Sequence, residues 1–305
     1  MKEEKVMTAR APRTILVTGV NGQVGFELRR SLQGLGRIVA ADRAALDLAD
    51  PVSIRACIRS VKPDVIVNSA AYTAVDQAES DAAAARTINA EAPAVLADEA
   101  KRLDALLVHY STDYVFDGTS THAYREDDAP NPQNVYGATK LEGEQAIAAS
   151  GASHLVFRTS WVYGQRGRNF LLTMLKLAGE RDELRVVADQ IGAPTWSATI
   201  AALTASVIAQ GVAHDASLAD WAREKSGIYH LTSGGSTSWA GFAEAIFAEA
   251  GLAHPPRVIP IPSSDYPTPA RRPLNSRLDG GRLARAFGLA APDWREALAL
   301  CLASR

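Results

Sequence analysis

The feature that most constrains this fold is a short β-branched run that leads into three evenly spaced glycines. Residues 14–18 are typical of a buried strand, and Gly19-x-x-Gly22-x-x-Gly25 follows at once, with a helical pattern of leucines beyond it. Glycines in this order permit a tight turn, close approach of the backbone to a pyrophosphate, and close packing of helix on strand. The helix N-terminus would offer free N–H groups to the phosphates. The pattern predicts a dinucleotide-binding turn.

Apolar runs alternate with helical stretches through the first half of the chain. The predicted strands that follow the first are 37–41, 64–68, 106–110 and 155–158, and the predicted helices between them are 51–61, 81–102 and 136–149. This alternation indicates an α/β fold with a doubly wound parallel sheet of the Rossmann type. Ligands bind such sheets beyond the carboxyl ends of the strands. Asp42, directly after the second strand, is at the expected distance for an acid that binds a ribose hydroxyl.

The chain of 305 residues is longer than one typical domain, so a smaller C-terminal substrate-binding lobe is expected beside the sheet. We expect a disordered leader at 1–13, the nucleotide-binding domain at 14–165, and mainly the lobe at 166–305, with some segments returning to the first domain. Helices are predicted at 170–177, 197–209, 239–250 and 294–303. The segment 266–273 is too rich in proline for regular structure.

Composition excludes several classes of function. The net charge of −2, with both signs mixed, gives no case for nucleic acid or an anionic membrane as partner. No apolar run reaches the roughly 18–20 residues that span a membrane. The charged N-terminus lacks the apolar region of a secretory signal. Two cysteines, Cys57 and Cys301, make neither a disulfide scaffold nor a metal site, which favours a cytoplasmic protein.

Candidate catalytic groups follow the fourth predicted strand. Thr112 stands at its end, and Tyr136 and Lys140 are four residues apart on a predicted helix, which places them on one face. A cation beside a phenol lowers a pKa that is ordinarily near 10. Such a tyrosine can give a proton to a carbonyl oxygen during reduction by hydride. Alone, the spacing also fits two solvated side chains, and the glycine turn upstream is what favours a reductase.

These motifs resemble the extended short-chain dehydrogenase/reductase family, and within it the dTDP-4-dehydrorhamnose reductases, from about residue 14 to the last helix. The glycine turn and the Tyr/Lys pair are common to the superfamily. The more specific motifs are HYSTDYVF at 109–116, RTSWVY at 158–163, DQIGAPT at 189–195 and YPTPARRPLNS at 266–276. The resemblance implies reduction of the C4 keto group of dTDP-4-dehydro-L-rhamnose to dTDP-L-rhamnose by NADPH, with NADH also accepted.

The resemblance also implies a role for each group in the site. Tyr136 would protonate the alkoxide, Lys140 would hold the nicotinamide ribose, and Thr112 would hydrogen-bond the reacting oxygen. The implied cofactor contacts besides Tyr136 and Lys140 are Gly19, Gly22, Gln23, Val24, Gly25, Asp42, Arg43, Asp47, Leu48, Ala71, Tyr72 and Thr73. The implied substrate contacts are Val75, Asp113, Tyr114, Trp161 and Arg271. Trp161 could also be an ordinary core indole, and Arg271 a solvated charge on a surface loop.

Two other interpretations stay open. A related class of chains acts as non-catalytic regulatory subunits, but such chains would have an eroded Tyr/Lys pair, and both residues are present here. The second alternative is a reductase, epimerase or dehydratase acting on another nucleotide sugar. A dehydratase needs acids beside the active threonine, whereas Thr112 is followed by Asp113 and Tyr114. A simple reductase is therefore favoured.

No metal site is expected. Some members of the resembled family dimerise through Mg²⁺ held by glutamates, and Glu27 would supply the first of these. After Thr195, however, come Trp196 and Ser197 with no carboxylate. Magnesium in near-octahedral oxygen coordination is poorly held by one carboxylate per chain. We therefore expect a monomer or a homodimer that needs no metal.

Overall fold

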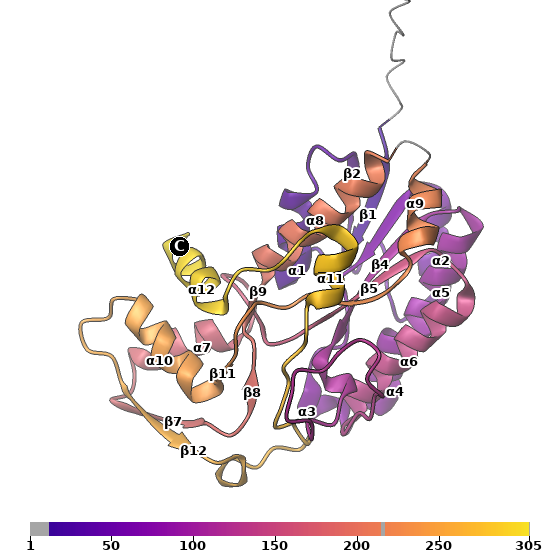
Figure 1. Ribbon diagram of the computed structural model, residues 1–305. Helices are drawn as coiled ribbons and strands as arrows, with labels where there is room; N and C mark the ends of the chain where they lie inside the picture. The colour runs from indigo at the N-terminus through magenta and orange to yellow at the C-terminus, as the bar shows by residue number, and fades with distance from the viewer. Residues whose placement is uncertain (1–11, 215–216, 305) are drawn as a thin grey trace, which may run out of the picture.

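In the computed structural model, which describes residues 12–214 and 217–304, a six-stranded parallel sheet is flanked by helices and carries a smaller lobe at one side (Figure 1). The strand order is β10-β5-β4-β3-β1-β2, and every neighbouring pair is parallel. The strands are β1 (Thr14–Thr18), β2 (Arg37–Ala41), β3 (Val65–Asn68), β4 (Leu106–Thr112), β5 (His154–Thr159) and β10 (Gly227–His230). The order reverses between β1 and β3, so the predicted doubly wound α/β fold is confirmed.

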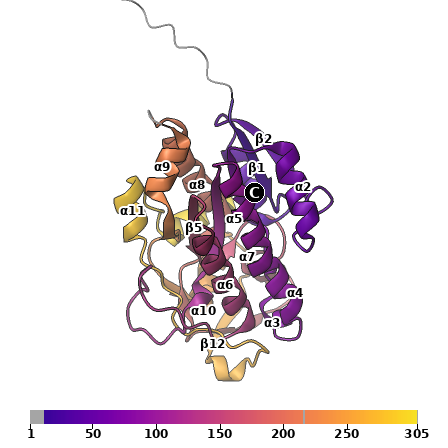
Figure 2. The same cartoon turned by 90° about the vertical axis from the view of Figure 1, so that its right-hand side faces the viewer.

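Each face of the sheet is covered by its own set of helices. On β1, Ile15 and Val17 belong to one apolar core and Leu16 to the other. The first core packs under α1 (Gln23–Ser31), α8 (Ser197–Val212), α9 (Leu218–Lys225) and α11 (Gly281–Phe287). The second packs under α2 (Pro51–Val61), α5 (Ala92–Arg102) and α6 (Val135–Ser150), which lie in front of the sheet in Figure 2. Burial on both faces explains why these strands are continuous apolar runs.

The predicted helix at 81–102 is one rod with a change of winding. It consists of α4 (Ala82–Arg86), the π-helical turn η1 (Thr87–Glu91) and α5. A further short helix, α3 (Val75–Ala78), precedes it. Inside the π-turn the Asn89 side chain accepts a hydrogen bond from Tyr72 N at 2.8 Å and donates to Tyr72 O at 3.0 Å. The turn therefore anchors the segment that leaves β3.

The lobe has an apolar core of its own. In it β7 (Glu183–Val187) pairs with β12 (Arg257–Ile261), and α7 (Phe170–Ala178), α10 (Trp239–Glu249) and α12 (Trp294–Ala303) pack together. Two short pairings lead into the lobe: β6 (Val162–Tyr163) with β9 (Thr195–Trp196), and β8 (Ile191–Gly192) with β11 (Thr237–Ser238). Figure 1 shows the lobe beside the main sheet, on the side away from α5.

Several elements of the C-terminal half pack with the main sheet and not with the lobe. The strand β10 and the helices α9 and α11 come from the C-terminal half and complete the main sheet and one of its cores. The sequence analysis expected returning segments without placing them, because β10 is only four residues long and its neighbouring helices are short. Arg13, expected in the leader, donates to Asp64 Oδ1 at 2.9 Å. Residues 1–11 of that leader lie outside the described part of the chain.

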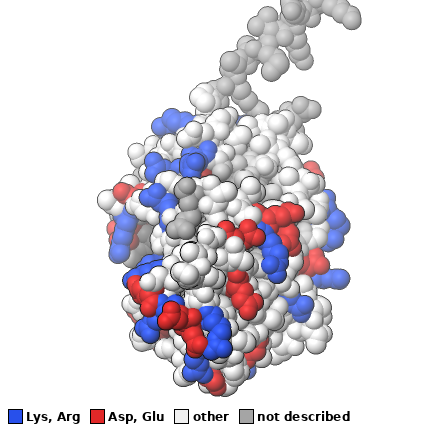
Figure 3. Space-filling view, turned by 90° about the vertical axis from the view of Figure 1, so that its left-hand side faces the viewer, with Lys and Arg blue, Asp and Glu red and all other residues white. Residues whose placement is uncertain are grey.

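Charges of both signs lie beside one another on the face shown in Figure 3. Searched over residues 12–214 and 217–304, the chain contains no helix long and apolar enough to cross a membrane.

Candidate active site

A cleft of about 840 Å³ opens beyond the carboxyl ends of the central strands and reaches the lobe. Its walls are the glycine turn after β1, the loop after β2, the ends of β3, β4 and β5, and two tryptophans. Most of the predicted site residues line it: Gly19, Gly22, Gln23, Val24, Asp42, Arg43, Asp47, Leu48, Ala71, Thr73, Val75, Thr112, Asp113, Tyr114, Tyr136, Lys140 and Trp161.

The glycine turn is shaped for close approach. Gly19 has φ +66°, and a Cβ there would lie 2.7 Å from Ala70 N. A Cβ on Gly25 would lie 2.2 Å from Gly19 O, so Gly25 acts in helix packing and does not line the cleft. Gly22 caps α1 without a side-chain hydrogen bond, which leaves N–H groups of the first turn open to an anion. These features fit a dinucleotide pyrophosphate.

The loop after β2 also lines the cleft. Asp42 Oδ1 accepts hydrogen bonds from Ala44 N at 3.0 Å and Ala45 N at 3.1 Å, which fixes the loop. Arg43 Nε lies 3.6 Å from Asp47 Oδ2, and the arginine side chain is 83% exposed. A carboxylate and a guanidinium therefore both reach this part of the cleft.

Tyr72 and Arg271 are not brought to the cleft. Tyr72 turns away, and its hydroxyl donates to Asp81 Oδ2 at 3.2 Å. Arg271 is exposed, and only its carbonyl is engaged, by Asn134 Nδ2 at 2.8 Å. Its neighbour Arg272 is the fixed arginine of this loop, with Nη2 2.7 Å from Asp76 Oδ2. Sequence alone could not separate the two adjacent arginines.

Tyr136 and Thr112 meet because α6 packs closely on the end of β4. The Asn134 side chain caps α6 by accepting from Gly137 N at 2.8 Å. A Cβ on Gly137 would lie 2.2 Å from Tyr114 O, so only glycine allows this approach. Desolvation, followed by the Asp113 charge, raises the pKa of Tyr136 to about 12, while the Thr112 hydroxyl opposes the rise. The phenol therefore keeps its proton at neutral pH.

The carboxyl of Asp113 is buried behind these two residues. Its Oδ1 accepts a hydrogen bond from Thr112 Oγ1 at 2.9 Å. Burial raises the pKa of Asp113 to about 6, while neighbouring hydroxyls work against that rise. The Thr112 oxygen also accepts from Tyr114 N at 3.1 Å, so the hydroxyl is held from both sides. Thr112 is thus a fixed group beside the Tyr136 phenol.

Lys140 is buried below the tyrosine and differs from the sequence expectation in one respect. Its Nζ donates to Tyr110 O at 2.6 Å and lies 3.0 Å from His109 Nε2. Burial lowers the pKa of Lys140 to about 8. Desolvation and then the Asp113 charge raise the pKa of Tyr136, and the expected depression by the Lys140 cation is not among the effects that set it. The four-residue spacing, about one helical turn, predicted the shared face of Tyr136 and Lys140 but not how deeply Lys140 is buried.

A stacked pair of indoles, one just after β5 and one at the start of α10 in the lobe, closes the cleft. The rings of Trp161 and Trp239 are 3.5 Å apart at their centroids and 5° from parallel. On the other side, a Cβ on Gly192 would lie 2.5 Å from the Trp161 ring. Trp239 Nε1 donates to Gln190 Oε1 at 3.2 Å. Trp161 has φ +45°, an uncommon conformation for a non-glycine residue, and is held there by these contacts.

Sequence reasoning missed several residues of the site. Trp239 was predicted only as the start of a helix, yet it supports Trp161 and lines the cleft. Arg168 lines the cleft beside Asn169, whose Nδ2 donates to Gln23 Oε1 at 3.0 Å and so ties the lobe to the glycine turn. His109 lay in a recognised motif without a role. A polar residue inside an apolar strand was the signal that could have identified it.

Residues 13–305 match the family described as RmlD substrate binding domain. The chain belongs to this family. It is 53% identical over 294 residues to dTDP-4-dehydrorhamnose reductase of Burkholderia thailandensis, covering 94% of this chain and 97% of that one. Identity to dTDP-4-dehydrorhamnose reductase of Escherichia coli K12 is 44% over 289 residues, covering 92% and 94%.

Solved structures agree with this membership. The structure of dTDP-4-dehydrorhamnose reductase from Bacillus anthracis in complex with NADP superimposes with a TM-score of 0.89 at 34% identity. The superposition covers 96% of this chain and 100% of that one. The whole described architecture, sheet and lobe together, is thus that of the RmlD substrate-binding family.

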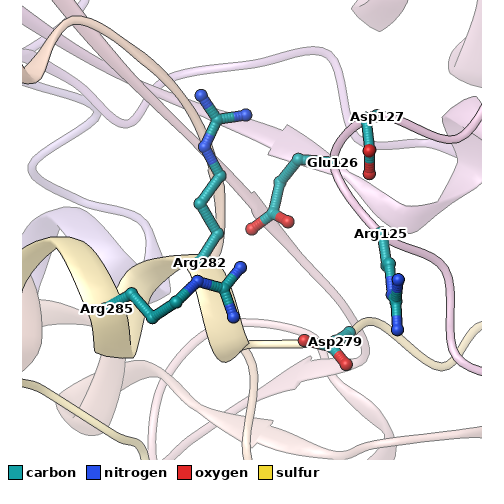
Figure 4. Close-up of a pocket in the computed structure, with 6 residues that line it drawn as sticks. All are labelled: Arg125, Glu126, Asp127, Asp279, Arg282 and Arg285. Atoms are coloured by element: carbon teal, nitrogen blue, oxygen red, sulfur yellow. The ribbon is translucent and has the colours of Figure 1, made fainter.

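A second cavity lies apart from the cleft and has a different character. It measures about 510 Å³, and in Figure 4 Arg282 and Arg285 of α11 face a loop that carries Glu126. Its other lining residues are Arg125, Asp127 and Asp279. Charges of both signs with little apolar surface do not suit a nicotinamide ring.

Over the described residues of this family member, no group of three or more His, Cys, Asp and Glu side chains is placed to hold a metal.

Proposed function

We propose that this protein reduces the C4 keto group of dTDP-4-dehydro-L-rhamnose to give dTDP-L-rhamnose, with NADPH as the preferred reductant and NADH also accepted. The observation that carries the proposal is that a glycine turn, a Thr112–Tyr136–Lys140 cluster and the Trp161–Trp239 pair meet in one cleft. The two relatives that match 94% and 92% of this chain are named dTDP-4-dehydrorhamnose reductase, which is this activity.

The cofactor would lie along the glycine turn, with its pyrophosphate at the open N-terminus of α1 and its adenosine end near Asp42 and Arg43. Bound there, NADPH supplies the hydride. Gln23, Val24, Leu48, Ala71 and Thr73 all line the cleft. Gln23 and Val24 would border the phosphates, Leu48 would border the adenine, and Ala71 and Thr73 would flank the path to the catalytic residues. Arg168 adds a positive charge on the lobe side of the same groove.

The protein's own groups supply the proton and the polarisation. Tyr136, protonated at neutral pH, would donate its phenolic proton to the oxygen at C4 as negative charge develops there. Thr112 would give its single hydroxyl proton to the same oxygen by turning it away from Asp113 Oδ1, while Tyr114 N keeps the hydroxyl oxygen in place. The buried Lys140 ammonium would hold ribose hydroxyls and stabilise the phenolate that remains.

The lobe would bind the nucleotide sugar. The Trp161–Trp239 stack gives a rigid apolar wall against which a sugar ring can lie, and Val75 and Tyr114 border the same space. Arg272 is already committed to Asp76, so the exposed Arg271 is the arginine of this loop that can turn toward a diphosphate. We assign residues 166–305 mainly to this role.

The proposal includes a simple biochemical setting. The enzyme would act as a monomer or homodimer. It would work in the cytoplasm, since its two cysteines give no case for an oxidising compartment. It would need no metal, because hydride transfer to a carbonyl held by Tyr136 and Thr112 leaves no step for a Lewis acid. The product would supply rhamnose for surface polysaccharides.

The test is a coupled reaction. dTDP-glucose is converted by the two preceding enzymes to dTDP-4-dehydro-L-rhamnose, the protein and NADPH are added, and the product sugar is identified by NMR. We expect NADPH oxidation that depends on the sugar nucleotide, and dTDP-L-rhamnose as product, with Tyr136→Phe as the inactive control. Turnover with UDP- or GDP-linked keto sugars instead would move the assignment to another nucleotide sugar. Cofactor binding without turnover on any of these would favour a non-catalytic subunit.

A further inference from the structure

A buried chain of polar side chains runs from Lys140 across three neighbouring strands. His109 Nε2 lies 3.0 Å from Lys140 Nζ, and His109 Nδ1 lies 3.0 Å from Asn68 Nδ2. Thr18 Oγ1 donates to Asn68 Oδ1 at 2.6 Å. All four side chains belong to residues at most 2% exposed. Thr18, Asn68 and His109 are register partners on β1, β3 and β4, so the sheet itself aligns them.

The donors and acceptors of this chain permit two complete arrangements. If Lys140 is an ammonium, it donates to His109 Nε2, and the imidazole proton is on Nδ1 and is given to the Asn68 oxygen. If Lys140 is a neutral amine, it accepts from Nε2–H, and Nδ1 accepts from the Asn68 amide. The structure has Asn68 Oδ1 toward Thr18 and Nδ2 toward His109, which belongs to the second arrangement. The first arrangement is converted to the second when Lys140 loses one proton to solvent and the imidazole proton moves from Nδ1 to Nε2.

We propose that His109 and Asn68 are positioning residues that set the protonation state of Lys140, through a histidine tautomer and an amide orientation that change together with the lysine proton. The imidazole itself stays neutral, since burial and the nearby Lys140 charge hold the pKa of His109 well below its usual range. An ammonium has three donors, and His109 and the Tyr110 carbonyl occupy two of them, which leaves one for a ligand. The proposal rests on the proposed function for its kinetic readout alone.

The other charged groups around Lys140 are engaged elsewhere or neutral, so they do not set its protonation state in place of His109 and Asn68. Glu144, one turn along α6, raises the pKa of Lys140, but its carboxylate is shared with Arg158 of β5. On the cleft side are Tyr136, kept neutral by its raised pKa, and the buried Asp113. Charges on further elements packed against α6 are engaged in ion pairs: Arg86 with Glu142, Glu99 with Arg59, and Asp76 with Arg272.

Two substitutions should move the pH profile in opposite directions. In His109→Leu the ammonium loses an acceptor, so the basic limb of kcat/KM should shift to lower pH by about one unit or more. In Asn68→Asp a carboxylate accepts from both Thr18 and His109 Nδ1–H, which fixes the first arrangement, and the same limb should shift to higher pH. His109→Gln, with a carbonyl oxygen that can accept, should restore most of the profile. Thr204→Val removes a buried hydroxyl that bonds the Tyr110 phenol outside the chain, and is the matched control.

The direct readout needs no turnover. Long-range ¹H–¹⁵N spectra of the imidazoles, with the His109 signals assigned by their loss in His109→Gln, should show Nδ1–H at pH 6.5 and Nε2–H at pH 10. A tautomer that does not change over this range would overturn the coupling, whatever the activity. If the tautomer changes but no keto sugar is reduced, the coupling stands and the proposed function fails. Equal losses of rate in both variants, without opposite shifts of the limb, would leave only a structural role and refute the proposal.

Discussion

Glu144, whose charge acts on Lys140, forms a buried ion pair with Arg158. Arg158 Nε donates to Glu144 Oε1 at 2.9 Å and Nη2 donates to Oε2 at 2.6 Å. The side chains are 3% and 1% exposed, and the guanidinium also lies 5.0 Å from the Phe116 ring centroid. Replacing one partner leaves a buried charge with neither water nor a counterion.

Glu144→Leu should therefore lower the free energy of unfolding by about 3–5 kcal/mol, the usual cost of breaking a buried pair from one side. For a chain of this size each kcal/mol corresponds to about 2 °C in Tm, so Tm should fall by about 6–10 °C. The double variant Glu144→Leu/Arg158→Met removes both charges and should recover most of this loss, because well-packed apolar residues often replace a buried pair at no cost.

The measurement is thermal and urea unfolding of the wild type, both single variants and the double variant. Surface pairs give the matched control: Arg185→Ala breaks the exposed contact with Asp265 and should cost at most about 1 kcal/mol. If Glu144→Leu costs no more than Arg185→Ala, or if the double variant is less stable than either single variant, the argument from burial is wrong. Because Glu144 raises the pKa of Lys140, the Leu variant should also lose activity at lower pH than the wild type as pH rises.

Three further predictions concern activity. Tyr136→Phe should slow reduction by about 10²–10⁴-fold, while the affinity for NADPH, measured by fluorescence, stays within a few-fold of the wild type. A variant with wild-type activity would show that Tyr136 is not the proton donor. Asp42 and Arg43 at the adenosine end act in opposite directions on a 2′-phosphate, so kinetics with both cofactors should show a preference for NADPH below about 10³-fold, or roughly 4 kcal/mol; a larger preference for either cofactor would mean that one of the two residues does not contact it. Activity and sedimentation should be the same with and without a chelator, and loss of either on chelation would reveal an acidic site that was not recognised.

The sequence by itself determined the local parts of this protein. The strand, glycine turn and helix at its start follow from chain-local chemistry, because Gly19 must adopt a positive φ and Gly25 must admit the Gly19 carbonyl. The continuous apolar runs specified a parallel sheet buried on both faces, and the four-residue spacing of Tyr136 and Lys140 fixed their common helix face. Each of these depends on residues within a few positions of one another.

Only the tertiary structure decided what depends on distant partners. The Tyr136 pKa was expected to fall and instead rises, because burial is set by the packing of α6 against the end of β4. Arg272, and not Arg271, is fixed by an ion pair with Asp76. The sequence could not show this, because Asp76 lies almost two hundred residues earlier in the chain. Trp239 acquires its place by stacking on Trp161. The chain from Thr18 to Lys140 exists because parallel register aligns polar residues of three strands, and register is a property of the sheet that no single strand contains.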